Sequence, residues 1–403
     1  MKDVQIDPDA ITNILTLRYN PNINSKLPTL VWNDFLPKYS HDESETTEIL
    51  LKNSIKNFVE QKKLKKTSFA ISGGIDSVLS LSCFRELYPE LKITCIFAGF
   101  DEKEDEAKEA ENISNYYNCD FKKIKLENFL SNLPEQISII KEPKWHYYWL
   151  FLAKEAKKYS NTLISGDGGD ELFGGYVFRY KKFLELTNKS VTWKNKTKAY
   201  LECHNRDWVE DQSAMFGHKA KFQWNKIHQN FFKYFNNPLT KLEQVFLADY
   251  NGKLKCDWIP ALNKIHKHLE IDGFSPFLNR KLIKFSAKLD LDKKYDFKTN
   301  TGKLPLRKIL EKKKIKLNNS KIGFSPNLPQ FWKNHGMELI DRYLFESRIA
   351  KDGWINQDWI IKSYAKSIKN NDIRYINKLL SILSFEIWYR LFITKEIKKS
   401  QKL

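Results

Sequence analysis

Short apolar runs alternate with helical stretches between residues 67 and 165, and this alternation limits what the chain can fold into. Turn residues bound each apolar run, as is typical of a buried strand, and the stretches between the runs show helical spacing. Repeated strand–helix–strand order predicts a parallel α/β sheet with right-handed crossovers and helices on both faces. The expected strands are residues 67–71, 93–98, 121–126 and 162–165, and the expected helices are residues 43–61, 77–87, 105–117, 133–140 and 145–159.

The strand pattern ends at about residue 181, and helical spacing continues from there to the end of the sequence. A chain of 403 residues is long enough for two or three domains. We therefore expect an N-terminal lead-in at 1–45, an α/β domain at 46–181, and a mainly helical region at 182–403. Because no low-complexity linker separates the last two, we expect them to pack tightly.

The composition is that of a soluble globular protein. Hydrophobic residues make up 41% of the chain and charged residues 29%, which excludes a disordered or collagen-like polypeptide. No apolar run approaches the roughly 20 residues that cross a bilayer, and the first residues lack the apolar stretch of a secretory signal. We expect a cytoplasmic protein without a membrane span.

The formal net charge of +19 has two interpretations. A basic face could bind nucleic acid. Lysines are scattered along the whole chain, however, and acidic residues interleave with them, as at 101–111; this pattern favours a solvated surface, so nucleic acid is not the expected partner. The five cysteines are far apart and include no C-x-x-C pair, which predicts reduced, buried side chains and neither disulfides nor a zinc site.

The first glycine loop, residues 72–77 (SGGIDS), lies between an expected strand and an expected helix. Backbone N–H groups at such a helix start form an anion cradle, and glycines let the backbone approach a phosphate. Asp76 would repel phosphate unless a cation lay between them, which indicates Mg²⁺. The string is not a Walker loop. A plain helix-capping turn is the alternative, and the full string makes it the weaker one.

The second glycine loop, residues 165–176 (SGDGGDELFGGY), also follows an expected strand. Ligands of open α/β sheets bind at the carboxyl ends of the strands. Closely spaced carboxylates need a counter-charge, which a metal–phosphate complex would supply. A solvated acidic turn is the alternative, but four glycines are a costly choice for a turn.

These two strings carry a family resemblance. The first is similar to the pyrophosphate loop of the N-type ATP pyrophosphatases, whose α/β fold is related to that of adenine nucleotide α-hydrolases. The second resembles the synthetase domain of asparagine synthetase and its relative β-lactam synthetase. The resemblance runs from about residue 46 to 393, and it includes the strings DEA at 105–107, LR at 306–307, KIGFSP at 321–326 and FEIWYRLF at 385–392.

The resemblance implies an ATP-dependent, AMP-forming amide ligase with Mg²⁺ as cofactor. Such an enzyme adenylates a carboxylate and then transfers ammonia or an amine to it. The residues that the resemblance assigns are Ser72, Gly73, Gly74, Ser77 and Gly166 for pyrophosphate, Ala98 and Gly99 for adenine, Asp76 and Asp170 for Mg²⁺, Asp167 for assisting the attack of the amine, and Lys321 for stabilising the developing negative charge.

The chain also departs from the family pattern. Complete asparagine synthetases begin with a glutaminase domain whose nucleophile is a cysteine exposed after Met1, whereas Lys2 follows Met1 here. We therefore expect the amine to come from free ammonia, from a separate glutaminase or from the substrate. Two arginines of the acceptor region are also replaced, in residues 261–264 (ALNK) and 272–279 (DGFSPFLN), and lysine does not reproduce an arginine fork. A carboxylic acid other than free aspartate becomes plausible.

Two other functions stay open on the sequence. A tRNA-modifying enzyme similar to lysidine synthetase would use the same first loop, although the string at 165–176 argues against it. A non-catalytic synthetase fold that serves as an interaction subunit is the second alternative, and the intact loops argue against that one.

Overall fold

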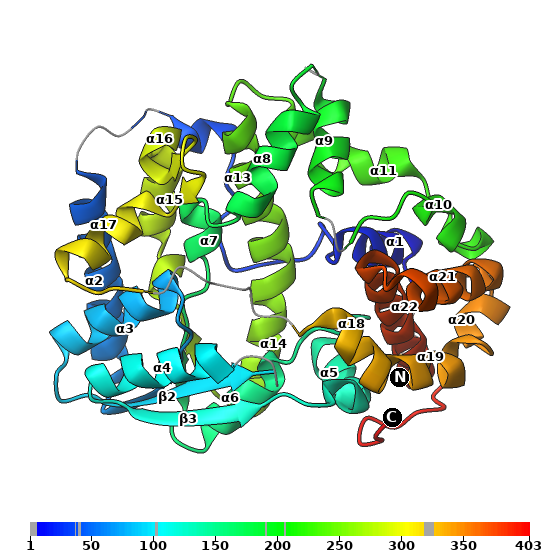
Figure 1. Cartoon of the computed structure of the whole chain (residues 1–403), viewed down its shortest axis with the longest axis horizontal. Helices are drawn as coiled ribbons and strands as arrows, with labels where there is room; N and C mark the ends of the chain where they lie inside the picture. Colours follow the sequence, from blue (N-terminus) through cyan, green and yellow to red (C-terminus); the bar gives the residue numbers. More distant parts are fainter. Residues whose placement is uncertain are drawn as a thin grey trace.

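A five-stranded parallel sheet forms the centre of the first part of the molecule (Figure 1). The computed structural model describes residues 6–36, 38, 42–100, 104–189, 192–204, 207–317 and 326–403. The strand order is β3-β2-β1-β4-β5, and every neighbouring pair is parallel. The strands are β1 (Lys66–Ala70), β2 (Lys92–Gly99), β3 (Asp120–Lys125), β4 (Thr162–Ile164) and β5 (Asp272–Phe274). The sequence prediction of a parallel α/β sheet is confirmed.

The sheet separates two hydrophobic cores, one on each face. Along β2, Cys95 and Phe97 belong to one core, and Ile96 and Ala98 belong to the other. Successive side chains of a strand point to opposite faces, so β2 is covered on both sides and its residues form a continuous apolar run. By contrast, the edge strand β3 carries exposed lysines, which discourage pairing with another chain.

The order of the strands determines which helices cover each face of the sheet. The chain runs outward from β1 to β3 and then returns past β1 to β4, so right-handed crossovers place α6 on the face opposite α3 and α4. The helices up to residue 186 are α1 (Pro8–Leu17), η1 (Trp32–Phe35), α2 (Glu43–Lys62), α3 (Ile75–Leu87), α4 (Glu104–Tyr116), η2 (Phe129–Asn132), α5 (Leu133–Ile140), α6 (Trp149–Lys157), α7 (Gly169–Phe173) and α8 (Val177–Leu186).

The helix expected at 145–159 begins later than predicted, at Trp149. Residues 145–148 are buried but not helical, and His146 and Tyr148 among them line the cavity described below. Their apolar pattern reflects burial against that cavity and the surrounding core, and a periodicity argument cannot separate such burial from a helical face.

The region after residue 181 is mainly helical, as expected, but it also completes the sheet. The prediction that the strands end there is wrong, because β5 pairs with β4 through Asp272 and Thr162. With three residues and a glycine at its centre, β5 has no strand pattern of its own, and its pairing with β4 defines it. A second, antiparallel pair joins β6 (Tyr295–Asp296) and β7 (Thr301–Gly302).

Many short helices make up the rest of this region. They are α9 (Trp193–Glu202), α10 (Gln212–Met215), η3 (His218–Ala220), α11 (Trp224–Gln229), α12 (Phe232–Phe235), α13 (Lys241–Asp249), η4 (Tyr250–Trp258), α14 (Ile259–Leu269), η5 (Pro276–Leu278), α15 (Arg280–Lys288), α16 (Leu291–Lys294), α17 (Leu304–Lys312), α18 (Leu328–Phe331), η6 (Trp332–Gly336), α19 (Met337–Leu344), α20 (Arg348–Lys351), α21 (Gln357–Asn370) and α22 (Ile373–Phe392).

The N-terminal residues pack into the body of the molecule. Asp7 caps α1 by accepting a hydrogen bond from the backbone of Asp9. α1 contacts α22, although the two helices lie at opposite ends of the sequence (Figure 1). Leu30 and Phe35 are buried in the core on the α3 side of the sheet. These residues therefore contribute to the same cores as the rest of the chain.

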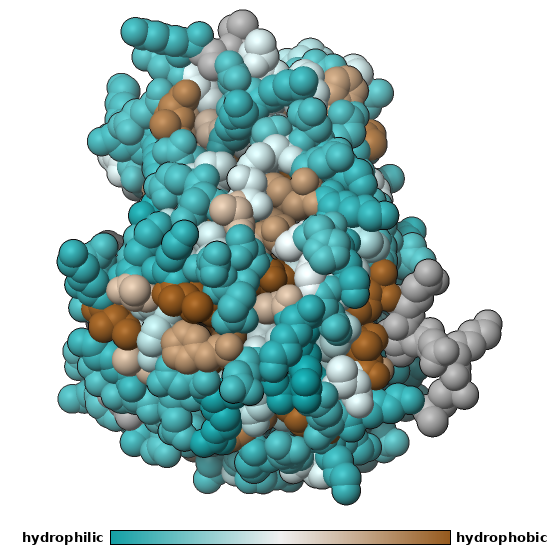
Figure 2. Space-filling view, turned by 90° about the vertical axis from the view of Figure 1, so that its right-hand side faces the viewer, coloured by the Kyte–Doolittle hydropathy of each residue, from teal (hydrophilic) through white to brown (hydrophobic). Residues whose placement is uncertain are grey.

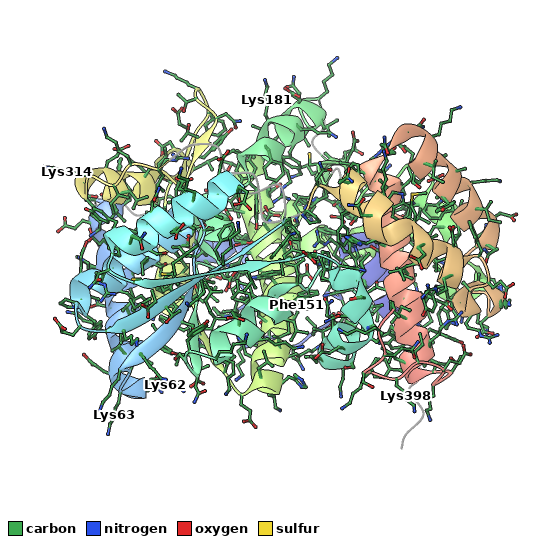
Figure 3. All side chains as sticks on the ribbon, turned by 60° about the horizontal axis from the view of Figure 1, so that its bottom comes forward. Lys62, Lys63, Phe151, Lys181, Lys314 and Lys398 are labelled. Atoms are coloured by element: carbon green, nitrogen blue, oxygen red, sulfur yellow. The ribbon has the colours of Figure 1, made fainter. Side chains whose placement is uncertain are left out.

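Lysines are spread over the surface, as the charge pattern predicts. Figure 3 shows Lys62 and Lys63 at one end of the molecule, Lys398 at the other, and Lys181 and Lys314 in further separate places. The face in Figure 2 is mostly hydrophilic, with small separate hydrophobic patches. Among the helices of the described residues, none is long and apolar enough to cross a membrane. All five cysteines are free and buried, as predicted.

Candidate active site

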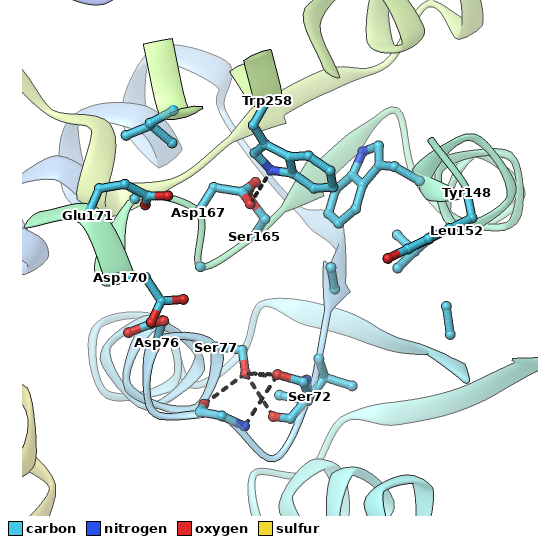
Figure 4. Close-up of a pocket in the computed structure, with 18 of the residues that line it drawn as sticks. Ser72, Asp76, Ser77, Tyr148, Leu152, Ser165, Asp167, Asp170, Glu171 and Trp258 are labelled. Atoms are coloured by element: carbon cyan, nitrogen blue, oxygen red, sulfur yellow. Dashed lines mark hydrogen bonds between the residues drawn. The ribbon is translucent and has the colours of Figure 1, made fainter. Parts of the chain in front are cut away.

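Two strand ends meet at the point where the sheet changes direction. β1 and β4 are neighbours, but the chain leaves β1 toward β2 and leaves β4 toward β5, on the opposite side. A crevice forms at such a switch point, and ligands of open α/β sheets bind there. A cavity of about 480 Å³ occupies this position and is lined by both glycine loops (Figure 4).

The first loop is closed by the hydroxyls of its two serines. Ser77 Oγ donates to the backbone oxygen of Ser72 at 2.7 Å and lies 3.1 Å from Ser72 Oγ (Figure 4). The backbone N–H of Gly74 donates to Ser72 Oγ at 3.3 Å. α3 begins directly afterwards at Ile75, so the first N–H groups of that helix point toward the loop. Such an arrangement could hold an anion at the helix N-terminus.

The second loop lies against the first, backbone to backbone. A Cβ at Gly166 would come within 2.9 Å of the carbonyl carbon of Asp76 and of the amide nitrogen of Ser77. Only glycine allows this approach. Gly168 has a φ of +97°, a left-handed conformation that also favours glycine and that turns the chain into α7. The glycines of this loop are therefore a geometric requirement of the site.

A buried lysine joins the two carboxylates that were predicted to bind metal. Lys303 Nζ lies 2.5 Å from Asp76 Oδ2 and 2.5 Å from Asp170 Oδ1. Burial alone would lower the pKa of the Lys303 ammonium, but Asp170 and Asp76 raise it above its usual value. Sequence reasoning missed Lys303, since a single lysine in a lysine-rich chain carries no motif.

The carboxylate pair fits a magnesium site that is completed by a substrate. Mg²⁺ is commonly held through one or two carboxylates together with phosphate oxygens. Asp76 and Asp170 share one cation here, so their oxygens already converge on a single point. Within the described residues, no group of three or more His, Cys, Asp or Glu side chains could hold a metal alone. The donor set therefore suits an ion that arrives with a phosphate.

Asp167 is held on both of its carboxylate oxygens. Ser165 Oγ donates to Oδ2 at 2.6 Å, and the Trp258 indole N–H donates to Oδ1 at 2.7 Å (Figure 4). Burial raises the pKa of the Asp167 carboxyl, and the nearby Asp76 and Asp170 raise it further. This makes Asp167 a stronger base than an ordinary aspartate, in a fixed orientation.

Glu171 is a second acidic group of the cavity, and sequence reasoning gave it no role. It accepts a hydrogen bond from the hydroxyl of Tyr176. Burial, together with the charge of Asp170, raises the pKa of Glu171 to about 7. Its charge therefore depends on pH near neutrality.

The side of the cavity that lies across from Asp76 and Asp170 is apolar. Ala98, at the end of β2, lines it together with Phe97, Tyr148 and Leu152. Tyr148 and Leu152 lie across the pocket from Asp76 and Asp170 (Figure 4), so a flat apolar ring could lie here while its charged groups reach the two loops.

A basic end completes the cavity. It is formed by Arg18, which directly follows α1, by His146 before α6, and by Lys253 within η4. Asp257 also lines the cavity, and it accepts hydrogen bonds from Lys144 Nζ at 2.7 Å and from the Tyr147 hydroxyl at 2.6 Å. None of these residues belongs to a motif of the sequence.

Most of the predicted site residues meet in this one cavity. Gly99 ends β2 but does not line the cavity, and Lys321 lies outside the described residues. The predicted residues that line the cavity are Ser72, Gly73, Gly74, Asp76, Ser77, Ala98, Gly166, Asp167 and Asp170.

A parallel sheet with two glycine loops and paired carboxylates at its switch point defines the class of protein: an α/β protein with a site for a nucleotide. The asparagine synthase family model matches residues 48–390, and the chain belongs to this family. The resemblance seen in the two loops is thereby confirmed. At the level of the family, the match supports an ATP-dependent enzyme of the ligase kind.

Individual relatives are more distant. Asparagine synthetase [glutamine-hydrolyzing] 1 of Bacillus subtilis is 24% identical over 377 residues, which cover 81% of this chain and 56% of the relative. Putative asparagine synthetase [glutamine-hydrolyzing] 2 of Methanocaldococcus jannaschii is 30% identical over 116 residues, or 27% of this chain and 22% of the relative. The chain thus spans about half the length of the Bacillus relative and less of the other.

Among solved structures, NMN synthetase from Francisella tularensis matches 56% of this chain and 94% of its own at 15% identity. The TM-score of this match is 0.25, which is too low to support a shared architecture.

Proposed function

We propose that this protein is an ATP-dependent, AMP-forming amide ligase that adenylates a carboxylate and transfers ammonia or an amine to it. The observation that carries the proposal is the convergence of both glycine loops and the Asp76–Asp170 pair on one cavity at the switch point of the sheet. The volume of about 480 Å³ falls within the range of small-molecule sites.

In the first half of the reaction, a carboxylate oxygen of the acid attacks the α-phosphorus of ATP. The bond between that phosphorus and the bridging oxygen breaks, and pyrophosphate leaves with the electron pair. The N–H groups at the start of α3 and the hydroxyls of Ser72 and Ser77 would bind the leaving pyrophosphate. Asp76 and Asp170 would hold Mg²⁺, which neutralises phosphate charge when bound.

In the second half, the nitrogen of ammonia or an amine attacks the carbonyl carbon of the acyl-adenylate. AMP leaves, and the attacking nitrogen loses a proton. Asp167 would accept that proton, because its pKa is raised and its carboxylate is fixed by Ser165 and Trp258. Lys321 stays a prediction for stabilising the negative charge.

The replaced arginines of the acceptor region support an acid other than free aspartate. At the two positions where the family pattern has these arginines, the chain has Lys264 and Phe274. Lys264 is engaged elsewhere, since it pairs with Glu142 at 2.5 Å and donates to the backbone of Ile140. Phe274 stacks on Phe58 with ring centroids 4.0 Å apart. Neither residue provides the carboxylate fork of an arginine.

The test is exchange of labelled pyrophosphate into ATP, run with a panel of carboxylic acids. Exchange that depends on one class of acid, with AMP as the nucleotide product once an amine is added, is the expected result. Release of ADP and phosphate instead, with no acid-dependent exchange, would show that ATP is cleaved at the wrong bond for this mechanism.

A further inference from the structure

A π-helical segment, η4, lies between α13 and α14 and borders the cavity. Lys253, Leu254, Asp257 and Trp258 of this segment all line it. π-Helical turns are rare and occur frequently at functional sites. The segment places a cation, an anion and an indole on one wall of the cavity.

Both acidic residues one turn away from Lys253 are committed to other partners. Asp249 accepts from Arg179 at 2.9 and 3.2 Å and from the Tyr200 hydroxyl at 2.7 Å. Asp257, on the other side, is bound by Lys144 and a tyrosine hydroxyl. Within the described part of the chain, no carboxylate oxygen lies within 4.0 Å of Lys253 Nζ. Its ammonium lies 5.7 Å from the centre of the Tyr176 ring.

Two further groups with unused binding capacity lie at this end. Arg18 forms a loose ion pair with Asp207, with 3.7 Å between the guanidinium and Oδ2, and the other oxygen of Asp207 accepts from Asn377 at 2.7 Å. The His146 imidazole is buried, and its Nε2 has no hydrogen-bond partner among the described residues. Burial lowers the pKa of His146 well below its usual range, and Arg18, Lys144 and Lys253 lower it further, so the ring is neutral near pH 7.

The remaining lining of this end is apolar or already neutralised. Leu17, Leu254 and Trp149 supply apolar walls. Among the carboxylates of the cavity, Asp76 and Asp170 pair with Lys303, Asp257 pairs with Lys144, and Asp167 and Glu171 accept from hydroxyl or indole donors; Glu106 and Glu109 line the cavity as well. Burial, together with the positive charges of Arg179 and Arg18, lowers the pKa of Lys253 to about 7, against the opposing effect of Asp249 and Asp207. The cations Arg18 and Lys253 therefore attract a negative charge to this end, and Asp257, the carboxylate of η4 in this lining, is already paired with Lys144.

We propose that Arg18 and Lys253, with His146 Nε2 beside them, form a subsite for a second acidic group of the acceptor, so that the acceptor is a dicarboxylic acid without an ammonium group. This inference rests on the proposed function, because it assigns the first carboxylate to adenylation at the glycine loops. Arg18 lies outside the residues 48–390 that match the family, whereas His146 and Lys253 lie inside them.

The test compares acids that share a carbon skeleton, using the full chain with a non-hydrolysable ATP analogue and Mg²⁺. Glutarate, glutamate and pentanoate form one set, and adipate, 2-aminoadipate and hexanoate form a second. Calorimetry should show that a diacid of either set binds about tenfold or more tightly than its monoacid and its amino-acid counterpart, as the loss of a charge-assisted contact requires. Lys253→Met and Arg18→Met should each reduce that preference to about twofold or less.

Lys255→Met is the matched control, since Lys255 lies on the same segment and does not line the cavity; it should keep the full preference. Lys253→Met should also fold, because it removes a charge that burial disfavours, and Lys253→Arg should keep the preference. Equal binding of diacid and monoacid by the unaltered protein, or a preference that survives both Met substitutions, would overturn the subsite.

The two proposals can fail separately. If diacids bind and Lys253→Met abolishes the preference, but no acid supports pyrophosphate exchange, the subsite stands and the ligase reaction is wrong. If monoacids support exchange as well as diacids do, and Lys253→Met changes nothing, the ligase reaction stands and the subsite is wrong.

Discussion

At the scale of single residues, Lys303 sets the charge balance of the candidate site. Its ammonium neutralises two carboxylates that face the same point. Removing one partner of a buried ion pair costs roughly 3–5 kcal/mol, so Lys303→Met should lower the free energy of unfolding by about that amount. Mg²⁺ should restore part of the loss. Urea unfolding with and without Mg²⁺ measures both effects.

The control for this variant lies on the helix that Lys303 precedes. Lys308 pairs with Glu43, but its side chain is 53% exposed, and exposed pairs contribute at most about 1 kcal/mol. If Lys303→Met is no more destabilising than Lys308→Met, the shared cation does not hold the two carboxylates together.

A substitution at Asp76 tests the proposal that this residue binds Mg²⁺. Asp76→Asn keeps the shape of the side chain but removes the charge that would bind Mg²⁺, so pyrophosphate exchange should fall by about a hundredfold or more. Asp292→Asn, at an exposed position on α16, should leave the rate unchanged. Normal exchange by the Asp76 variant would mean that the metal is bound elsewhere.

Sequence reasoning reached the loop residues of the site but not the cations Arg18, Lys253 and Lys303. Residues 72–77 and 165–176 are contiguous strings whose backbone creates the binding surface, so they can be recognised in one dimension. Arg18 and Lys253 line the cavity, and Lys303 pairs with two carboxylates of its lining. These cations come from three separate segments, and only tertiary packing brings them together. In a chain with 68 basic residues, none of them is distinguishable by type alone.

At the scale of elements, contact between the two loops depends on Gly166. An added Cβ would meet backbone atoms of Asp76 and Ser77 at 2.9 Å, so the two loops would have to move apart. Gly166→Ala should therefore reduce stability by about 1–3 kcal/mol and weaken ATP binding. Gly73→Ala is the comparison, because its Cβ would meet the end of the flexible Glu109 side chain. Equal losses in thermal unfolding would argue against the backbone contact.

The packing of α14 against α6 predicts a pH dependence. Burial lowers the pKa of His266 to about 4, and its neutral ring accepts a hydrogen bond from Trp149 Nε1 at 3.0 Å. The unfolded chain binds a proton at this histidine below about pH 6.5, while the folded protein does not. Stability should therefore be complete above pH 6.5 and fall by roughly 3 kcal/mol as the pH drops to 4.

His266→Gln isolates this effect. Glutamine can still accept from Trp149, but it does not titrate, so the variant should lose less stability than the unaltered protein between pH 6.5 and 4. Chemical unfolding at several pH values gives the difference. If the free energies of unfolding of the variant and the unaltered protein differ by the same amount at every pH in this range, His266 is not held neutral.

Helices and strands with a periodic pattern of hydrophobic residues were predicted from the sequence. Elements without such a pattern were not. α5 spans the predicted residues 133–140, and β1, β2 and β4 lie at or within a residue or two of their predicted positions. β5 and the π-helical segment η4 went unnoticed, since a short paired strand and a widened helical turn leave no periodic trace in the sequence.

At the scale of the whole molecule, the charge of +19 is distributed instead of gathered on one face. Lys62, Lys181 and Lys398 lie far apart (Figure 3). We therefore expect bulk tRNA at low salt to leave pyrophosphate exchange unchanged, because a scattered charge gives weak, nonspecific binding. Stimulation of exchange by tRNA would favour the tRNA-modifying alternative. Sequence reasoning anticipated this distribution from the interleaving of acidic residues.

The late position of β5 in the chain has a consequence for biosynthesis. When the ribosome has just released β4, the strand that will pair with its open edge has not yet been translated, and residues 165–271 must emerge first. At ordinary translation rates of about 5–20 residues per second, this interval lasts several seconds. During that time the nascent protein exposes the open edge of an apolar strand beside an unfinished crevice, and this is the stage at which a chaperone would have most to shield.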